Sequence, residues 1–376
     1  MSKAGEMSEA GEMSETQSAA VQTPDTESAP AAAGESTPPE TSSETLPSEA
    51  ETARLIERAA VARDAILEQV GRRIIGQREV VELALISLFS RGHSIFVGAP
   101  GLAKTRLVNS LAEALGLSFG RIQFTPDLMP SDITGTEILQ EDPETRQRSF
   151  RFLKGPVFTQ LLLADELNRT PPKTQAALLQ AMQEGQVTAA GETRQLPAPF
   201  IVFATQNPVE QEGTYPLPEA QLDRFMLMIE VGYPSAEEEA QIVAETTSGE
   251  DAAITPVLDG EQLLELQRLA RQLPVAEDVI RYAVALVRAT RPDDPSAPER
   301  VREMVRWGAG PRASQFLIIA AKSRALLSGR LAASREDVRA VAPSILGHRV
   351  LTSFRAEAEG LSSRALVAEI IAEVPR

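Results

Sequence analysis

Eight consecutive residues, GAPGLAKT at positions 98–105, have the types and the spacing of a loop that binds phosphate groups. In such a loop, backbone N–H groups and the start of the following helix face the anion. The lysine reaches the outer phosphates and the threonine hydroxyl binds Mg²⁺. Ala103 stands where the pattern usually has its second glycine, so the loop alone also fits an ordinary strand-to-helix turn. The candidate residues are Gly98, Ala99, Pro100, Gly101, Leu102, Ala103, Lys104 and Thr105.

Two acidic residues follow an apolar run further along the chain, in LLLADE at 161–166. If this run is a strand, Asp165 at its end would complete the coordination of Mg²⁺. Glu166 would then polarise an attacking water molecule. Many strands end in acidic residues, so this pair by itself leaves the chemistry open.

A third polar group follows another apolar run, in PFIVFATQNP at 199–208. The carboxyl ends of neighbouring parallel strands open on one crevice, so we expect Asn207 beside Glu166, where it would orient the water. The alternative is that Asn207 only forms a turn before Pro208. Together, the loop, the acids and the asparagine occur in the order that an ATP site needs, and they predict ATP and Mg²⁺ as ligands.

The elements that must position these residues can be read from hydrophobic spacing. Helical spacing precedes the loop at 51–76, and 105–116 and 172–185 are helical patterns that end at a glycine. Short apolar runs alternate with them and predict buried strands. These runs lie at 94–98, 120–124, 158–165, 199–205 and 225–231. The alternation predicts an α/β fold in which helices cover both faces of a parallel sheet.

Three regions follow from this pattern. We expect an α/β nucleotide-binding domain at 51–233 and an all-α domain at 234–376, because strand patterns stop after Tyr233. Residues 1–50 contain ten acidic residues, one lysine and no aromatic residue. Such a segment buries too little apolar surface to fold, so we expect a disordered solubilising tail, or alternatively an arm that docks on a basic partner.

Composition excludes several other classes of protein. The chain has no cysteine, and its two histidines, His93 and His348, are far apart in the sequence. Disulfides, thiolate metal sites and thiol nucleophiles are therefore absent. No apolar run approaches the ~18–20 residues that span a bilayer, and the N-terminus has no signal-like pattern, so we expect a cytoplasmic protein.

The chain resembles the MoxR family of AAA+ ATPases over roughly residues 52–376. In that family an alanine before the Lys-Thr pair is usual. We therefore expect a non-glycine backbone dihedral at Ala103, and retained ATP binding when Ala103 is replaced by glycine. The resemblance rests on the segments GAPGLAKT, FTPDLMPSDITG, KGPVF, LLLADELNRTPPKTQAALLQAMQEGQVT, ATQNPVEQEGTYPLPEAQLDRF, GPRAS and REDVRAVAPSILGHRV.

The resemblance implies a role for each matching position. Lys104 and Thr105 match the Walker A pair of the family. Asp165 and Glu166 match its Walker B pair, and Asn207 matches its sensor 1 residue. ATP, Mg²⁺ and an attacking water would then meet at these five residues.

Further positions match parts of the family that lie outside the phosphate loop. Arg224 matches the arginine finger that reaches the ATP of a neighbouring subunit, and Arg312 matches the sensor 2 arginine of the lid. The adenine-side contact corresponds to three residues, Ile75, Gly76 and Gln77. Residue types alone favour an ordinary surface or ion-pair role for each of the two arginines.

A finger supplied by a neighbour implies a closed ring, by analogy a hexamer. Two further segments resemble the family's insertions, 126–158 with a hairpin around residues 142–145, and a second hairpin at 185–200. The first is long for a connection, which favours an element that faces the pore of the ring or a partner.

The residues predict Mg²⁺-dependent ATP hydrolysis. The resemblance implies that this takes place in a ring and is coupled to chaperone-like remodelling, maturation or metal insertion of a partner. For proteins of this family, the partner often carries a von Willebrand A domain. A nucleic-acid motor is one alternative, because arginines are frequent in 281–312, although acids are interleaved with them. A binding module that ATP switches without turnover is the other.

Overall fold

The computed structural model describes residues 48–141, 146–208, 213–247 and 252–375. The tail expected at 1–50 therefore lies almost wholly outside the described residues, as does the hairpin tip expected at 142–145. Of the helices that are described, none is both long and apolar enough to cross a membrane.

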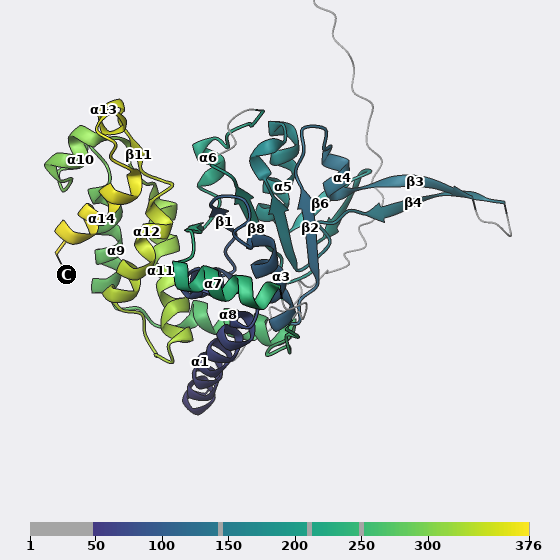
Figure 1. Cartoon of the computed structure of the whole chain (residues 1–376), viewed down its shortest axis with the longest axis horizontal. Helices are drawn as coiled ribbons and strands as arrows, with labels where there is room; N and C mark the ends of the chain where they lie inside the picture. Colours follow the sequence, from purple (N-terminus) through teal and green to yellow (C-terminus); the bar gives the residue numbers. More distant parts are fainter. Residues whose placement is uncertain (1–47, 142–145, 209–212, 248–251, 376) are drawn as a thin grey trace, which may run out of the picture. The chain divides into compact units, whose positions relative to one another are not determined.

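A five-stranded parallel sheet carries the segments that the sequence marks as chemically active (Figure 1). Its strand order is β2-β5-β8-β1-β9, and every neighbouring pair runs parallel. Each strand lies in, or within one residue of, an expected apolar run. The strands are β1 (Ser94–Val97), β2 (Phe119–Gln123), β5 (Leu161–Asp165), β8 (Ile201–Gln206) and β9 (Leu227–Glu230).

Helices cover both faces of this sheet, as a parallel sheet requires. Side chains alternate along β5, so that Leu161 and Leu163 pack toward one face while Leu162 packs toward the other. The first face is covered by α1 (Glu49–Gly71), α2 (Arg78–Phe89) and α3 (Lys104–Ala114). The second is covered by α4 (Pro130–Thr134) and α5 (Pro172–Glu184). Each leucine buried in this way contributes about 1.5–3 kcal/mol by leaving water.

Two antiparallel hairpins interrupt the alternation of strands and helices. The longer pairs β3 (Gly135–Glu141) with β4 (Arg148–Lys154) and extends away from the sheet (Figure 1). The shorter pairs β6 (Gln186–Ala189) with β7 (Glu192–Gln195). Both hairpins fall inside the two expected insertions. A short 3₁₀ helix, η1 (Leu167–Arg169), and α6 (Glu219–Leu222) complete this part of the chain.

The described residues after Tyr233 are mainly helical. The helices are α7 (Ala236–Thr246), α8 (Gly260–Gln272), α9 (Glu277–Ala289), α10 (Glu299–Met304), α11 (Pro311–Leu327), α12 (Arg335–Leu346), α13 (Phe354–Ala358) and α14 (Ser363–Glu373). An antiparallel ribbon of β10 (Val305–Trp307) and β11 (Leu351–Thr352) and an isolated bridge between Val275 and Ala333 are not included in a purely helical expectation. Runs of two or three residues are too short to give a strand pattern in sequence.

One apolar cluster runs through most of the fold. It extends from Ile56 in α1 to Ile371 in α14, and α11 packs against α1 and α2 as well as against α8, α9 and α12. The helical region and the first face of the sheet thus share a continuous core. A division of the chain at 233/234 stays a prediction.

A buried carboxylate ties the helical region together. Asp337, fully buried in the first turn of α12, accepts hydrogen bonds from Arg324 at 2.5 Å and from Arg330 at 2.5 and 2.6 Å. The backbone N–H of Ser334 also donates to it, at 2.9 Å. Burial raises the pKa of this carboxyl, but the hydrogen bonds from Arg330, Ser334 and Arg324 outweigh burial and lower the pKa to about 2.

Replacement of Asp337 by alanine is expected to lower the free energy of unfolding by about 1–3 kcal/mol, because the partly exposed guanidinium groups of Arg324 and Arg330 and the backbone N–H of Ser334 lose their acceptor. Denaturant titration at pH 7 measures this loss. The pKa of Asp337 is lower in the folded state, so its contribution is complete above about pH 4 and declines between about pH 4 and pH 2. The exposed neighbour Glu336, replaced by alanine, is the control and should change stability by less than about 0.5 kcal/mol. Equal losses in the two variants would contradict this account.

Candidate functional site

The expected phosphate-binding loop connects β1 to α3. Gly98 follows the last residue of β1, and α3 begins at Lys104. A Cβ atom on Gly98 would lie 2.5 Å from the carbonyl oxygen of Val231, and Gly101 has a φ of +83°, so both positions favour glycine. The loop therefore brings the amino end of a helix to the carboxyl edge of the sheet, where a helix attracts anions.

Ala103 has a φ of 53° and a ψ of 21°, which is the left-handed conformation, at the position that caps α3. The expectation of a non-glycine dihedral at this alanine is therefore wrong. The loop imposes the geometry that glycine adopts most easily, and the alanine methyl group is accommodated at a cost of about 1–2 kcal/mol.

The Ala103→Gly variant is expected to keep its ATP affinity and to gain up to about 1 kcal/mol in unfolding free energy. The relief of the left-handed strain exceeds the extra entropy that glycine gives the unfolded chain. Calorimetric titration with ATP and denaturant unfolding measure the two quantities. The matched control is Ala65→Gly within α1, where a right-handed helix should lose about 1 kcal/mol. Loss of ATP binding in Ala103→Gly would show that the methyl group is required.

The Lys104 side chain turns back onto its own loop. Its ammonium donates to the carbonyl oxygens of Gly98 at 2.5 Å and Ala99 at 3.0 Å. Burial lowers the pKa of Lys104, while the nearby charges of Asp165 and Glu166 raise it. The ammonium thus lies between the loop and the two acids.

The two acidic residues lie at the end of β5, which is flanked by β2 and β8 in the sheet. Asp165 is buried; its Oδ1 accepts from the Thr205 hydroxyl at 2.6 Å and its Oδ2 accepts from Arg121 Nη2 at 2.6 Å. The Thr205 hydroxyl also accepts from the backbone N–H of Glu166 at 2.8 Å. Thr205 therefore fixes both acids relative to β8.

Glu166 is strained as well as acidic. Its φ is 57°, an uncommon conformation for a residue other than glycine, and such outliers concentrate at functional sites. Its Oε2 accepts from Gln123 Nε2 at 2.7 Å and from Arg169 Nη1 at 2.9 Å. In this arrangement, the carboxylate is held by neighbouring side chains from β2 and η1.

Sequence reasoning missed Arg121, Gln123 and Arg169, and gave Thr205 no role. Arg121 and Gln123 flank Ile122 on β2, and Gln123 lies opposite Asp165 in the register. No local pattern in the sequence marks Arg121 and Gln123, because they reach the acids only through the strand order, which places β2 beside β5 although β3 and β4 come between them in the chain.

Most of the predicted site residues line one cavity of about 360 Å³. The cavity brings the loop together with both acids and with the asparagine at the end of β8, so these predicted neighbours do meet. Its lining residues are Pro100, Gly101, Leu102, Ala103, Lys104, Thr105, Arg106, Asp165, Glu166, Thr205 and Asn207. Because the lining combines backbone donors, an ammonium and two carboxylates, the cavity can hold a phosphate chain with a divalent cation.

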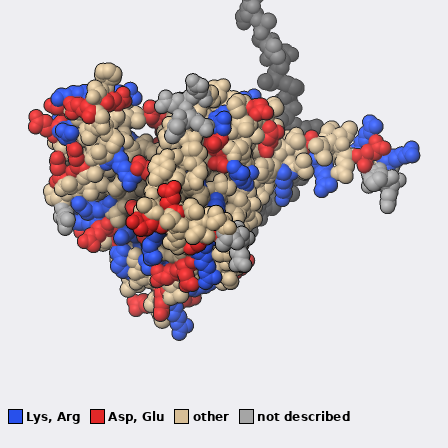
Figure 2. Space-filling model, viewed as in Figure 1, with Lys and Arg blue, Asp and Glu red and all other residues tan. Residues whose placement is uncertain are grey.

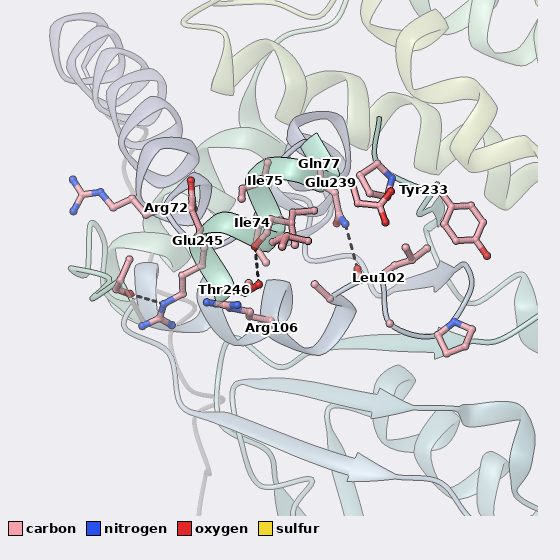
Figure 3. Close-up of a pocket in the computed structure, with 18 of the residues that line it drawn as sticks. Arg72, Ile74, Ile75, Gln77, Leu102, Arg106, Tyr233, Glu239, Glu245 and Thr246 are labelled. Carbon is pink, nitrogen blue, oxygen red and sulfur yellow. Dashed lines mark hydrogen bonds between the residues drawn. The ribbon is translucent and has the colours of Figure 1, made fainter. Parts of the chain in front are cut away.

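A second cavity of about 890 Å³ shares residues 100–103 and Arg106 with the first (Figure 3). Ile75 and Gln77 line it, whereas Gly76 lines a smaller cavity beside it. Gln77 Nε2 donates to the carbonyl oxygen of Leu102 at 3.2 Å, which ties this wall to the loop. The apolar side chains and the volume suit the base and sugar of a nucleotide.

Helix α7 forms one side of the larger cavity. Ile242 and Val243 line the cavity, yet no residue of α7 is buried, and Val243 is 56% exposed. A helix with an apolar edge and no buried residue gains little from packing in this state. A ligand in the larger cavity would therefore give α7 apolar contacts that it lacks.

The two predicted arginines are not in the lining of either cavity. Arg224 lies between α6 and β9, and its guanidinium forms no hydrogen bond or ion pair with the residues that the structure describes. Arg312 is the second residue of α11, and its Nη1 lies 2.8 Å from Asp223 Oδ2. The structure thus leaves both arginines away from the phosphate side of their own chain.

Comparison with known proteins connects this geometry to a family. Residues 93–227 match the model of the ATPase family associated with various cellular activities (AAA), and residues 297–370 match that of the AAA lid domain. The first range contains the loop, both acids, Asn207 and Arg224, and the second contains Arg312.

Individual relatives extend the match over most of the chain. Chaperone MoxR1 of Mycobacterium tuberculosis is 43% identical over 311 residues, which are 81% of this chain and 80% of that protein. Protein MoxR of Methylorubrum extorquens is 32% identical over 297 residues, 75% of this chain and 85% of that protein. A crystal structure of a proposed ATPase from Cytophaga hutchinsonii has a TM-score of 0.78 and 40% identity, and the match covers 85% of this chain and 97% of that one.

Proposed function

Because the chain belongs to the MoxR family of AAA+ ATPases, we propose that it hydrolyses ATP in an Mg²⁺-dependent reaction within an oligomeric ring. The observation that carries this proposal is the single cavity in which the phosphate loop meets Asp165, Glu166 and Asn207. The adjoining larger cavity supports a complete nucleotide rather than a phosphate ion alone.

The residues in the smaller cavity fit Mg²⁺. The Thr105 hydroxyl and the Asp165 carboxylate, which would hold it, supply oxygen donors. Among the described residues, no cluster of three or more acids and histidines is placed to hold a metal alone. This is the pattern for Mg²⁺, which usually takes one or two carboxylates and completes its shell with water and phosphate oxygens. When bound, it would neutralise charge on the phosphates.

Two side chains must exchange partners before the reaction can occur. Lys104 would leave the carbonyl oxygens of Gly98 and Ala99 and bind the β- and γ-phosphates. Glu166 would leave Gln123 and take up the attacking water. Both exchanges replace hydrogen bonds within the chain by hydrogen bonds to the substrate.

Proton transfer then follows from the position of Glu166. Its carboxylate accepts a proton from the water, and the water oxygen forms a bond to the γ-phosphorus. The bond from the γ-phosphorus to the oxygen that bridges it to the β-phosphate breaks, which gives ADP and phosphate. Asn207 would orient the water, and Arg224 of a neighbouring subunit would stabilise the charge that develops on the γ-phosphate.

What the free energy of ATP hydrolysis would be used for is proposed here from the family. One relative is named a chaperone, and remodelling, maturation or metal insertion of a partner protein is the function that we propose here. The partner would be a protein with a von Willebrand A domain, and the ring would be a hexamer. Arg312 would sense the γ-phosphate and transmit hydrolysis to the lid.

The distribution of charge on the surface disfavours a nucleic-acid motor. The visible face shows Lys and Arg side chains interleaved with Asp and Glu (Figure 2). Many arginines of 281–312 lie in ion pairs, such as Arg281 with Glu277, Arg288 with Asp294 and Arg300 with Glu369. Paired arginines offer little net charge to a phosphate backbone.

Phosphate release measured at steady state tests the proposed activity. Release is expected with ATP and Mg²⁺ and should disappear when a chelator removes the cation. An ATP-switched binding module would bind ATP without sustained release. Salt-sensitive binding of DNA or RNA that stimulates release would instead favour the nucleic-acid motor.

A further inference from the structure

Arg349 is a buried arginine that lies three residues after α12 ends, and no role for it followed from the sequence. Only 2% of its side chain is exposed. Its guanidinium carbon Cζ lies 5.1 Å from the ring centre of Phe316 in α11. Burial lowers its pKa to about 10, against the opposing effect of Asp223, so the guanidinium stays charged at neutral pH.

The contacts of Arg349 converge on a short stretch of backbone, residues 223–226. Its Nη2 donates to the carbonyl oxygens of Asp223 at 2.9 Å and Phe225 at 2.6 Å, and its Nη1 donates to that of Met226 at 3.3 Å. Nε donates to Asp223 Oδ1 at 2.8 Å. One side chain thus holds three of the four backbone carbonyls in this stretch, and the fourth belongs to Arg224.

The hydrogen bonds also link two parts of the fold. Nη1 of Arg349 donates to the carbonyl oxygen of Ile345 in α12 at 2.5 Å, which fixes the arginine to the helical region. The stretch that it holds belongs to the sheet region, directly before β9. A planar guanidinium has five N–H donors in a rigid arrangement. It therefore fixes both the distance and the orientation of residues 223–226 relative to α12.

Asp223 connects this cluster to the lid arginine. One carboxylate oxygen accepts from Arg349, and the other accepts from Arg312 at 2.8 Å. Arg224 follows Asp223 in the chain, and its own side chain has no partner among the described residues. The backbone around Arg224 is therefore held by the buried Arg349, while the guanidinium of Arg224 is available to a neighbouring subunit.

We infer that Arg349 is a positioning residue, which holds residues 223–226 so that Arg224 points toward the nucleotide of the adjacent subunit. This inference rests on the proposed function, in which Arg224 acts across a subunit interface. Arg349 does not touch the substrate in this scheme. It acts through Arg224, and its loss should therefore lower the rate of hydrolysis at the site of the neighbouring subunit.

The test uses the full-length Arg349→Gln and Arg349→Lys proteins. Both are expected to lower kcat for ATP hydrolysis roughly 10- to 100-fold, because a displacement of about 1 Å in a catalytic group has effects of this size. The KM for ATP and the affinity for ATP should change less than about twofold, since the phosphate loop is untouched. Lysine keeps the charge but lacks the fork, so it should not restore activity. The control Arg300→Gln removes an exposed ion pair in the same region and should leave kcat unchanged.

Mixing experiments separate positioning from general damage. In a mixture of Arg349→Gln with Glu166→Gln, the first protein supplies the acid and the second supplies a well-placed Arg224, so activity is expected to rise above both parents. A mixture of Arg349→Gln with Arg224→Ala has no well-placed finger and should show no rise. If Arg349 only stabilised its own chain, neither mixture would gain, and the ATP affinity of Arg349→Gln would fall.

The outcomes also distinguish this inference from the proposal on which it rests. If Arg224→Ala is rescued by Glu166→Gln but Arg349→Gln is not, Arg224 acts between subunits and the positioning role of Arg349 is wrong. If neither is rescued, catalysis across the interface fails and the inference falls with it. Unchanged kcat in both Arg349 variants would overturn the inference by itself.

Discussion

Replacement of Glu166 by glutamine is expected to lower kcat for ATP hydrolysis roughly 10²- to 10⁴-fold, the range that a general base contributes. Glutamine has nearly the same size, and the backbone N–H at 166 keeps its bond to Thr205 at 2.8 Å. The strained backbone at φ 57° is likewise retained. The substitution removes the ability to accept a proton from water and the ion pair with Arg169, but it leaves the phosphate loop unchanged, so the affinity for ATP should stay within about twofold.

Steady-state phosphate release and calorimetric titration with ATP measure these two quantities separately. The matched control is Glu184→Gln at the end of α5, an exposed acid whose loss should affect neither. A near-normal kcat in Glu166→Gln would mean that another group activates the water. A large fall in ATP affinity would instead assign Glu166 to binding, and the proposed division of roles between the two acids would be wrong.

The sheet was predictable because each strand that carries chemistry is a short apolar run before a polar residue. Buried parallel strands require such runs, and the polar residues at their ends are tolerated because that edge of the sheet opens on a cavity. Lys104, Asp165 and Asn207 could therefore be expected together from their order in the sequence. The structure brings them to one cavity of about 360 Å³.

The groups that hold Glu166 in this state could not be predicted in the same way. Gln123 reaches Glu166 only because β2 pairs with β5, and strand order is a property of the tertiary fold.

The contacts of Arg349 were not predictable either. Arg349 is separated from Asp223 by more than a hundred residues, and an arginine in a sequence usually indicates a solvated surface. Its burial depends on acceptors that only the folded chain supplies.

Ala103 illustrates the opposite failure, in which a sequence argument gave the wrong conformation. An alanine in place of a glycine suggests that the backbone avoids the left-handed region, since a Cβ atom disfavours it. Tertiary context overrides that local preference here, because the loop must turn between β1 and α3 with a φ of 53° at this residue. A local preference of about 1–2 kcal/mol is small beside the packing of the strand and helix that the loop joins.

Replacement of Arg224 by alanine is expected to lower kcat by about 10³-fold or more, the size of effect that an arginine finger has in related phosphoryl transfers. Stability should change by less than about 0.5 kcal/mol, since the guanidinium forms no ion pair among the described residues. ATP affinity should also persist, because Arg224 lines neither of the two cavities. Phosphate release, denaturant unfolding and ATP titration on one preparation test these three expectations together.

The location of Arg224 outside its own site makes the mixing experiment decisive. When Arg224→Ala and Glu166→Gln are mixed in equal amounts, about one quarter of the interfaces in a randomly assembled ring pair an intact acid with an intact finger. Two nearly inactive proteins should therefore recover up to about a quarter of the normal rate if the sites act independently. The control replaces Arg224→Ala by the double variant Glu166→Gln with Arg224→Ala, which supplies no intact acid and should recover nothing.

An absence of recovery would have one clear meaning if both parents still bind ATP and assemble. Arg224 would then act within its own chain, which would require residues 223–226 to move toward the phosphate loop. Arg349 and Asp223 oppose such a movement, because the hydrogen bonds that hold this stretch would have to break in a buried environment. Action across the interface needs no such rearrangement, and this is the physical reason to expect that the mixture recovers activity.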